Sequence, residues 1–149
     1  MSIVLAVDPG TTQSAFLLMG NDWEILDKGK VFNEELRPIV AEYGYNIMVI
    51  EGFQSFGMSV GHTVFQTAYF IGRLLEIAEN TEHETHIVYR QDVKLHHCHT
   101  CKAKDANLRQ ALVDRFGDPG TKKNPGKLYG ISKDVWSALA IATYWHDTH

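Results

Sequence analysis

The chain has 149 residues, of which 44% are hydrophobic, and a formal net charge of −4 at pH 7. This length fits one domain of ordinary size, which we expect to extend over residues 1–149. The longest apolar runs, residues 3–7 and 138–142, are too short to span a bilayer, and two cysteines make no disulfide framework. Met1 leads directly into a strand pattern without an export signal, so we expect a cytoplasmic protein with no membrane partner.

The pattern of apolar residues predicts an α/β domain with a mixed sheet. Short β-branched runs that stop at Gly, Pro or Asn-Asp turns indicate strands, and apolar residues three or four apart indicate helices. Strands are expected over residues 3–8, 14–19, 23–31, 47–51 and 85–89, the first three as an antiparallel meander. Helices are expected over residues 34–43, 61–80 and 103–116, and from Ser132, as N-cap, to about Trp145.

Two acids, Asp8 and Glu51, end strands that read as fully buried, and a glycine follows closely after each. Binding sites in open α/β sheets form outside the carboxyl ends of adjacent strands. A third acid, Asp134, is predicted in the first turn of the last helix, where the helix dipole favours a carboxylate even without another role. Mg²⁺ and Mn²⁺ prefer oxygen ligands, and two such ions can promote phosphodiester cleavage. These three acids are therefore a candidate metal site.

Basic residues are concentrated in one part of the chain. Residues 90–133 hold ten of the fourteen Lys and Arg but only four of the eighteen Asp and Glu. A basic segment on an acidic body is typical of a protein that holds a phosphate backbone with one face. A solvated surface with chance clustering is the alternative interpretation.

Four segments together resemble one known family. Ile3-Val-Leu-Ala-Val-Asp8-Pro-Gly10, Ile50-Glu51, Arg90-Gln-Asp-Val-Lys94 and Asp134-Val-Trp-Ser-Ala-Leu-Ala-Ile-Ala142 occur in the order of the RuvC family of Holliday-junction resolvases. The similarity covers nearly the whole chain and is closest to the short RuvC-like enzymes often carried by bacteriophages. It implies an RNase H-like fold with a five-stranded sheet flanked by helices, and a homodimer in the cytosol of a bacterium or a phage-infected cell. It also implies two Mg²⁺ or Mn²⁺ ions and hydrolysis of branched double-stranded DNA at four-way junctions.

The same resemblance assigns roles to single residues. Asp8, Glu51 and Asp134 match metal-binding acids of the family. Many members have a further Asp where this chain has Ser137, which would share a helix face with Asp134 and hold a metal through water.

Lysines of the family near the scissile phosphate match Lys94 and either Lys102 or Lys104. A lysine there would neutralise charge developing on the phosphate oxygens, or would only contact a phosphate.

Three other features leave alternatives open. Phe53 and Phe56, in a Gly-rich loop after Glu51, can stack on unpaired junction bases or pack in the core. The loop over residues 118–130, with Lys122, Lys123 and Lys127, can hold the DNA backbone or be merely flexible.

Residues 96–101 contain three His and two Cys, so Cys98 and Cys101 are half of a conceivable structural zinc site, with His83 and His86 as further ligands. The competing interpretation is a polar loop that meets DNA.

The sequence is compatible with two rival functions. One is a non-catalytic junction-binding protein whose site decayed at Ser137. The other starts from the segment from Asp8 to Thr12, which also resembles the first phosphate loop of the actin, sugar-kinase and Hsp70 group. That resemblance implies a nucleotide-binding phosphotransferase module, although those proteins enclose ATP between two such domains.

Overall fold

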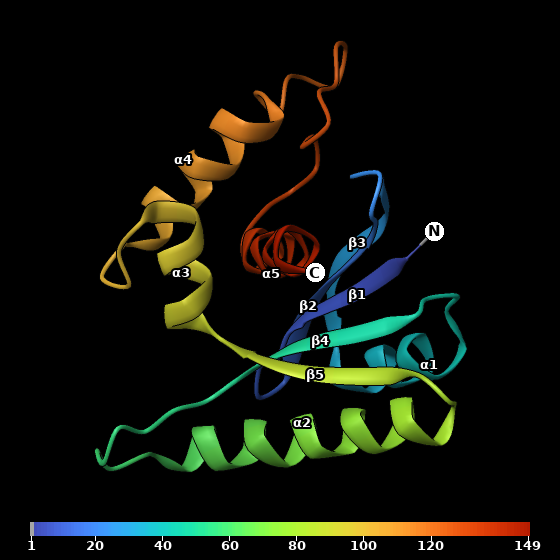
Figure 1. The fold of residues 1–149 in the computed structure, drawn as a ribbon. Helices are drawn as coiled ribbons and strands as arrows, with labels where there is room; N and C mark the ends of the chain where they lie inside the picture. Colours follow the sequence, from blue (N-terminus) through green and yellow to red (C-terminus); the bar gives the residue numbers. More distant parts are fainter. Residues whose placement is uncertain (1) are drawn as a thin grey trace.

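Five strands form one mixed sheet in the order β3-β2-β1-β4-β5 (Figure 1). The computed structural model describes residues 2–149. β1 pairs antiparallel with β2 and parallel with β4, β2 pairs antiparallel with β3, and β4 pairs parallel with β5. The strands are β1 (Ile3–Asp8), β2 (Gln13–Gly20), β3 (Ile25–Phe32), β4 (Ile47–Gly52) and β5 (Glu84–Tyr89). The predicted meander and all five predicted strands are therefore present, with ends shifted by at most two residues.

Helices cover both faces of the sheet (Figure 1). The helices are α1 (Asn33–Glu42), α2 (His62–Asn80), α3 (Arg90–Cys98), α4 (Asp105–Phe116) and α5 (Val135–Thr148). In β1, Leu5 and Val7 pack in the core under α1 and α2, whereas Val4 and Ala6 pack in the core under α5. A strand buried on both faces needs apolar side chains at every position, which explains the continuous apolar run at the start of the chain.

The C-terminal helices differ from the prediction in two places. A short helix, α3, follows β5 directly where no helix was expected; only Val93 in it is buried, so it lacks a long apolar stripe. The expectation that Ser132 caps the last helix is wrong, because Asp134 is the N-cap residue and Val135 begins α5. Lys133 has a positive φ of 51°, so a right-handed helix cannot run through this residue from Ser132.

The spacing of apolar residues over 61–80 predicts one core-facing side, and the structure corrects this in part. The residues predicted on that side are Val64, Phe65, Ala68, Tyr69, Gly72, Leu75 and Ala78. The residues of α2 that face the core are Thr67, Phe70, Ile71, Leu74 and Ala78. Phe65, Ala68, Tyr69 and Gly72, which were assigned to one apolar face, are exposed to solvent. The helix therefore has a second, outward apolar face. None of the helices in residues 2–149 has the length and apolarity that a membrane crossing requires.

A buried hydrogen-bond network fixes the turn between β1 and β2. Gly10 N–H donates to Ser14 Oγ (3.0 Å), and Ser14 Oγ donates to Asn33 Oδ1 (2.7 Å). The Asn33 amide donates in turn to the carbonyls of Gly10 and Thr11 (3.0 and 3.1 Å). A Cβ at Gly10 would lie 2.2 Å from the Gln13 carbonyl oxygen, so only glycine fits this turn. The network holds the chain immediately after Asp8 in one conformation.

Candidate functional site

Strand register brings the two strand-end acids together. β1 and β4 pair in parallel with Val7 opposite Ile50, so Asp8 and Glu51 follow at the same level on neighbouring strands. Opposite residues in a sheet point to the same face. Ala15 lies opposite Asp8 on β2, Lys30 opposite Ala15 on β3, and Val88 opposite Glu51 on β5. One row of side chains on the α5 face therefore runs across the whole sheet, with two carboxylates at its centre and an ammonium group at one end.

The two carboxyl groups strongly perturb each other. Burial, followed by repulsion from the Glu51 and Asp134 carboxylates, raises the pKa of Asp8 to about 7. Burial also raises the pKa of Glu51, against the attraction of Arg90, and the two carboxyl groups share a hydrogen bond. Near neutral pH the Asp8 and Glu51 carboxyl groups thus share one proton at the carboxyl ends of β1 and β4. Paired, partly buried carboxylates of this kind occur in functional sites that bind protons or cations.

The third predicted acid is near the pair but not joined to it. Asp134 is close enough to Asp8 to raise its pKa, yet its Oδ2 lies 2.7 Å from Lys30 Nζ. Within residues 2–149, no three His, Cys, Asp or Glu side chains are gathered as a metal-binding group. Ser137, one helical turn beyond Asp134, is half-buried at the start of α5. The predicted triad is therefore a close pair of acids, with Asp134 held beside it by Lys30.

Cationic side chains from α3 border the acidic pair on the β5 side. Arg90 Nη1 lies 3.7 Å from Glu51 Oε1, and a second guanidinium nitrogen contacts Asp105 at the start of α4. Lys94 Nζ lies 3.5 Å from Asp105, and its side chain is only 14% exposed. Burial opposes ionisation of Asp105, but Arg90 and Lys94 outweigh it and lower the pKa of this carboxyl. Of the predicted lysines, Lys94 is thus the one placed within electrostatic reach of Glu51.

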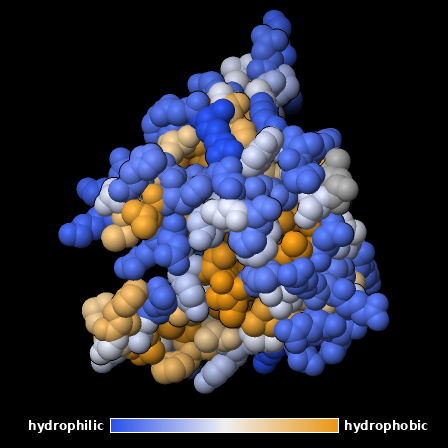
Figure 2. All heavy atoms as spheres, viewed as in Figure 1, coloured by the Kyte–Doolittle hydropathy of each residue, from blue (hydrophilic) through white to orange (hydrophobic). Residues whose placement is uncertain are grey.

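The remaining predicted DNA-contact residues lie on the surface. Phe53 and Phe56, in the loop after β4, are 46% and 62% exposed, so they are not core residues. Figure 2 shows apolar side chains gathered over this loop and the start of α2, at the lower left. Lys102 and Lys104 are exposed between α3 and α4. The loop that carries Lys122, Lys123 and Lys127 extends away from the sheet after α4, at the top of Figure 1.

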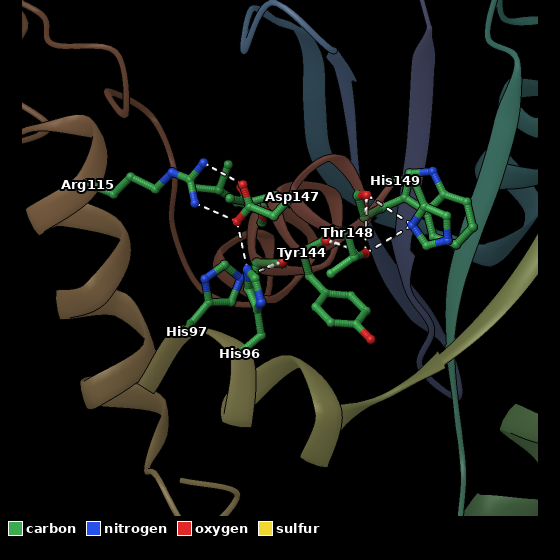
Figure 3. Close-up of polar contacts among 11 residues, drawn as sticks. His96, His97, Arg115, Tyr144, Asp147, Thr148 and His149 are labelled. Atoms are coloured by element: carbon green, nitrogen blue, oxygen red, sulfur yellow. Dashed lines mark hydrogen bonds and ion pairs between the residues drawn. The ribbon is translucent and has the colours of Figure 1, made fainter. Parts of the chain in front are cut away.

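The first half of the histidine-rich segment, residues 96–98, is the end of α3 and contacts α5, so its interpretation as a loop is wrong there, whereas residues 99–101 lie outside the helix. His96 Nε2 lies 2.7 Å from Asp147 Oδ2, which Arg115 of α4 also contacts through two hydrogen bonds of 2.5 and 2.7 Å (Figure 3). His97 Nε2 lies 2.9 Å from the Ala140 carbonyl, and burial lowers the pKa of this histidine. Cys98 is half-buried and Cys101 exposed. The histidines at 96 and 97 thus hold helices together, and no group of three ligands for zinc forms within residues 2–149.

Sequence reasoning did not single out Lys30, Arg90 or Asp105 as parts of this site. The signal for Lys30 was its position in the meander, because the antiparallel pairing of β1 with β2 and of β2 with β3 sets Lys30 level with Asp8. The signal for Arg90 was its place directly after β5, at the same sheet edge as Glu51. Asp105 had no sequence signal, because the contact that brings the start of α4 beside Arg90 depends on the unpredicted helix α3.

Comparison with solved structures identifies the fold. RuvC of Thermus thermophilus superposes with a TM-score of 0.72, at 14% sequence identity, over 98% of this chain and 96% of that protein. T. thermophilus RuvC in complex with Holliday junction substrate superposes with a TM-score of 0.73, at 16% identity, over 97% and 92% of the two chains. No protein-family model and no curated protein sequence matches the chain. The chain has a RuvC-like, RNase H-like fold, which confirms the predicted fold class.

The raised pKa of Asp8 predicts a pH-dependent stability. Because the folded-state pKa of about 7 exceeds the usual value of 3.8, the native state binds more protons than the unfolded state between these pH values. The free energy of unfolding therefore carries a contribution from Asp8 that is complete below pH 4 and is lost as pH rises through about 7.

In chelator, Asp8→Asn should therefore gain thermal stability relative to wild type between about pH 5 and 8. Thermal unfolding followed by circular dichroism across this range measures the difference. Asp22→Asn, which alters an exposed acid in the turn before β3, is the control and should unfold in parallel with wild type. A parallel curve for Asp8→Asn as well would contradict the raised pKa.

Proposed function

We propose that this protein is a metal-dependent endonuclease that hydrolyses phosphodiester bonds at four-way or other branched DNA junctions. The single observation that supports this proposal most strongly is the Asp8–Glu51 carboxyl pair, level on adjacent parallel strands and bordered by cationic side chains. A RuvC-like fold over nearly the whole chain adds to it, since one of the similar structures is a RuvC bound to a Holliday junction.

The donor set fits a hard divalent cation such as Mg²⁺ or Mn²⁺. Asp8 and Glu51 present only carboxylate oxygens, and their repulsion at neutral pH is relieved by either a proton or a cation. Asp134 would join them on leaving Lys30, and Ser137 would add a hydroxyl or a bound water. A bound ion would supply Lewis-acid activation of water and of the phosphate. Whether the site holds one ion or two depends on these last two residues.

The chain's own cations have separable roles around the substrate phosphate. Lys94 is largely withdrawn from solvent and held by Asp105, so its ammonium group is positioned to stabilise charge on phosphate oxygens near Glu51. Lys102 and Lys104 flank that position and would contact the DNA backbone. Lys122, Lys123 and Lys127 would hold a more distant arm of the junction. Phe53 and Phe56 offer exposed rings for stacking on unpaired bases, in the loop that follows Glu51.

The outward face of α2 supports a homodimer. Phe65 is 49% exposed, and Ala68 and Gly72 beside it are small enough for a second helix to approach closely. Exposed Ile87 extends the same surface beside α2, where it lines a hollow together with Ala68. Two subunits related by a two-fold axis would place two carboxyl pairs on a four-way junction.

The function is tested with four-way junction, flap and linear duplex DNA, each in Mg²⁺ and in Mn²⁺. Wild type should cleave a branched substrate, whereas Asp8→Asn, Glu51→Gln and Asp134→Asn should each lose cleavage by at least about a hundredfold. Binding of the junction in chelator should change little, because affinity comes mainly from Lys and Arg contacts. Asp114→Asn, on an exposed part of α4, is the matched control and should cleave normally. Tight junction binding without any cleavage would instead support the non-catalytic alternative.

The Lys30–Asp134 ion pair should compete with metal binding. Both side chains are partly exposed, so the pair is worth about 1 kcal/mol or less, and a divalent ion can displace it. Lys30→Met should therefore lower the dissociation constant for Mn²⁺ by at most about fivefold, as measured by calorimetry or electron paramagnetic resonance. Lys28→Met, two residues earlier on the same strand, should leave it unchanged. Weaker Mn²⁺ binding in Lys30→Met would mean that Lys30 positions Asp134 as a ligand.

The dimer surface is tested by placing a charge in it. Ala68→Glu would bury a carboxylate at a helix–helix contact, so the variant should be monomeric at concentrations where wild type is dimeric. Multi-angle light scattering over a dilution series measures this. Ala106→Glu makes the same change at an exposed position of α4 and should leave the dimer intact. A monomeric wild type would exclude this interface.

A further inference from the structure

A polar cleft lies between α1 and α2, on the sheet face opposite α5. It has a volume of about 460 Å³, and the residues that line it include Thr11, Thr12, Arg37, Gln66, Tyr69 and Arg73. Asn33, which fixes the turn after Asp8, also lies in its wall, so the turn belongs to both the cleft and the carboxyl-pair site. The volume is in the usual range for small-ligand pockets, which suits a nucleotide unit rather than a duplex.

The two arginines of the cleft are unusual in this part of the molecule. Outside residues 90–133 the chain has only four basic residues, Lys28, Lys30, Arg37 and Arg73. Arg37 on α1 and Arg73 on α2 are both exposed and both line this one cleft. None of the ion pairs within residues 2–149 includes either of them. With Glu34 as the one acid in the lining, the cleft carries a net charge of +1 on otherwise acidic helices.

The chemistry of the lining matches a phosphate joined to a base. Guanidinium groups bind phosphate oxygens through paired hydrogen bonds, and two of them from opposite walls can hold one phosphate. The Tyr69 ring is 64% exposed at the same cleft, and a base can stack on such a ring without sequence preference. The Thr11 side chain, which lines the cleft, is held by a contact between its hydroxyl and that of Thr67 (3.1 Å).

We propose that this cleft binds one nucleotide of the DNA strand that continues from the cleaved bond, with its phosphate between Arg37 and Arg73 and its base against Tyr69. The proposal rests on the proposed nuclease function and specifies how the substrate strand leaves the carboxyl-pair site. Thr11 is three residues from Asp8, so their Cα atoms are at most about 11 Å apart. A strand at Asp8 therefore reaches the cleft by passing around the β1–β2 turn, at the carboxyl edge of the sheet.

The test is the salt dependence of junction binding by wild type and Arg37→Gln/Arg73→Gln, both in chelator so that no DNA is cut. Fluorescence anisotropy with a labelled four-way junction should show a several-fold higher dissociation constant for the double variant. The slope of log affinity against log salt should fall by roughly 0.7–0.9, as expected for one lost phosphate contact. Arg37→Lys/Arg73→Lys keeps both charges and should restore the slope. An unchanged affinity and slope in the Gln variant would overturn the proposal.

Two further arms separate the possible explanations. Tyr69→Leu should weaken binding of single-stranded dT12 and leave the salt slope intact, because stacking releases no counterions. An unchanged dT12 affinity would remove the base from the proposal.

If the true ligand is a free nucleotide, dAMP should raise the melting temperature of wild type but not of Arg37→Gln/Arg73→Gln, and the double variant should bind DNA as wild type does. This result would also overturn the proposal. If wild type binds no junction, the proposed nuclease function fails, and the binding of dT12 then tests the cleft by itself. Binding of dT12 by wild type that is lost in Arg37→Gln/Arg73→Gln would support a nucleotide site in the cleft. No binding of dT12 by wild type would overturn it.

Discussion

Two carboxyl groups held at one level on adjacent parallel strands are the constraint around which this molecule is arranged. Withdrawal from water opposes the ionisation of both groups, and repulsion from Glu51 further opposes that of Asp8. The pair must therefore share a proton, gain a cation, or be surrounded by positive charge. The structure surrounds the pair with positive charge only in part. Arg90 approaches Glu51 at 3.7 Å, whereas Lys30 is engaged by Asp134 instead of Asp8. The negative charge that remains unbalanced at the pair is the basis of the proposed site for a divalent ion and a phosphate.

The cations around the pair are held by carboxylates of their own, and this arrangement keeps them exchangeable. Lys94 and Arg90 both contact Asp105, and Lys30 contacts Asp134. Each contact is partly exposed, so each is weak enough for a phosphate or a metal ion to replace one partner at little cost. By contrast, the bidentate Arg115–Asp147 contact and its neighbour His96 lie away from the pair and join three helices. The same residue types thus form weak, exposed contacts around the carboxyl pair and join helices at Asp147.

The sequence was most informative where a single periodicity decided the structure. The run at β1 is apolar at every position because both faces are buried, and its end at Asp8 could be placed without further information. The parallel pairing that sets Asp8 level with Glu51 followed from strand order in the resemblance, not from spacing in the chain. Helix α3 was missed because it buries one residue, so its stability comes from tertiary contacts such as His96–Asp147 that no local pattern encodes. The start of α5 was misplaced because Ser132 has the chemistry of a cap, whereas the backbone at Lys133 excludes a helix there.

The apolar residues of α2 show why the sequence pattern could not predict which side of this helix faces the core. The helix has apolar residues on nearly all sides, and a wide stripe can be assigned to the core or to a partner with equal ease. The structure assigns Phe70, Ile71 and Leu74 to the core and leaves Phe65, Ala68 and Gly72 outside. Between these two faces, on the side toward α1, the helix turns Gln66, Tyr69 and Arg73 into the polar cleft. One helix thus presents three different chemistries around its circumference. A second subunit on the outward stripe would therefore leave the α1 side of α2 facing the DNA, with the β1–β2 turn as the link between the cleft and the carboxyl pair.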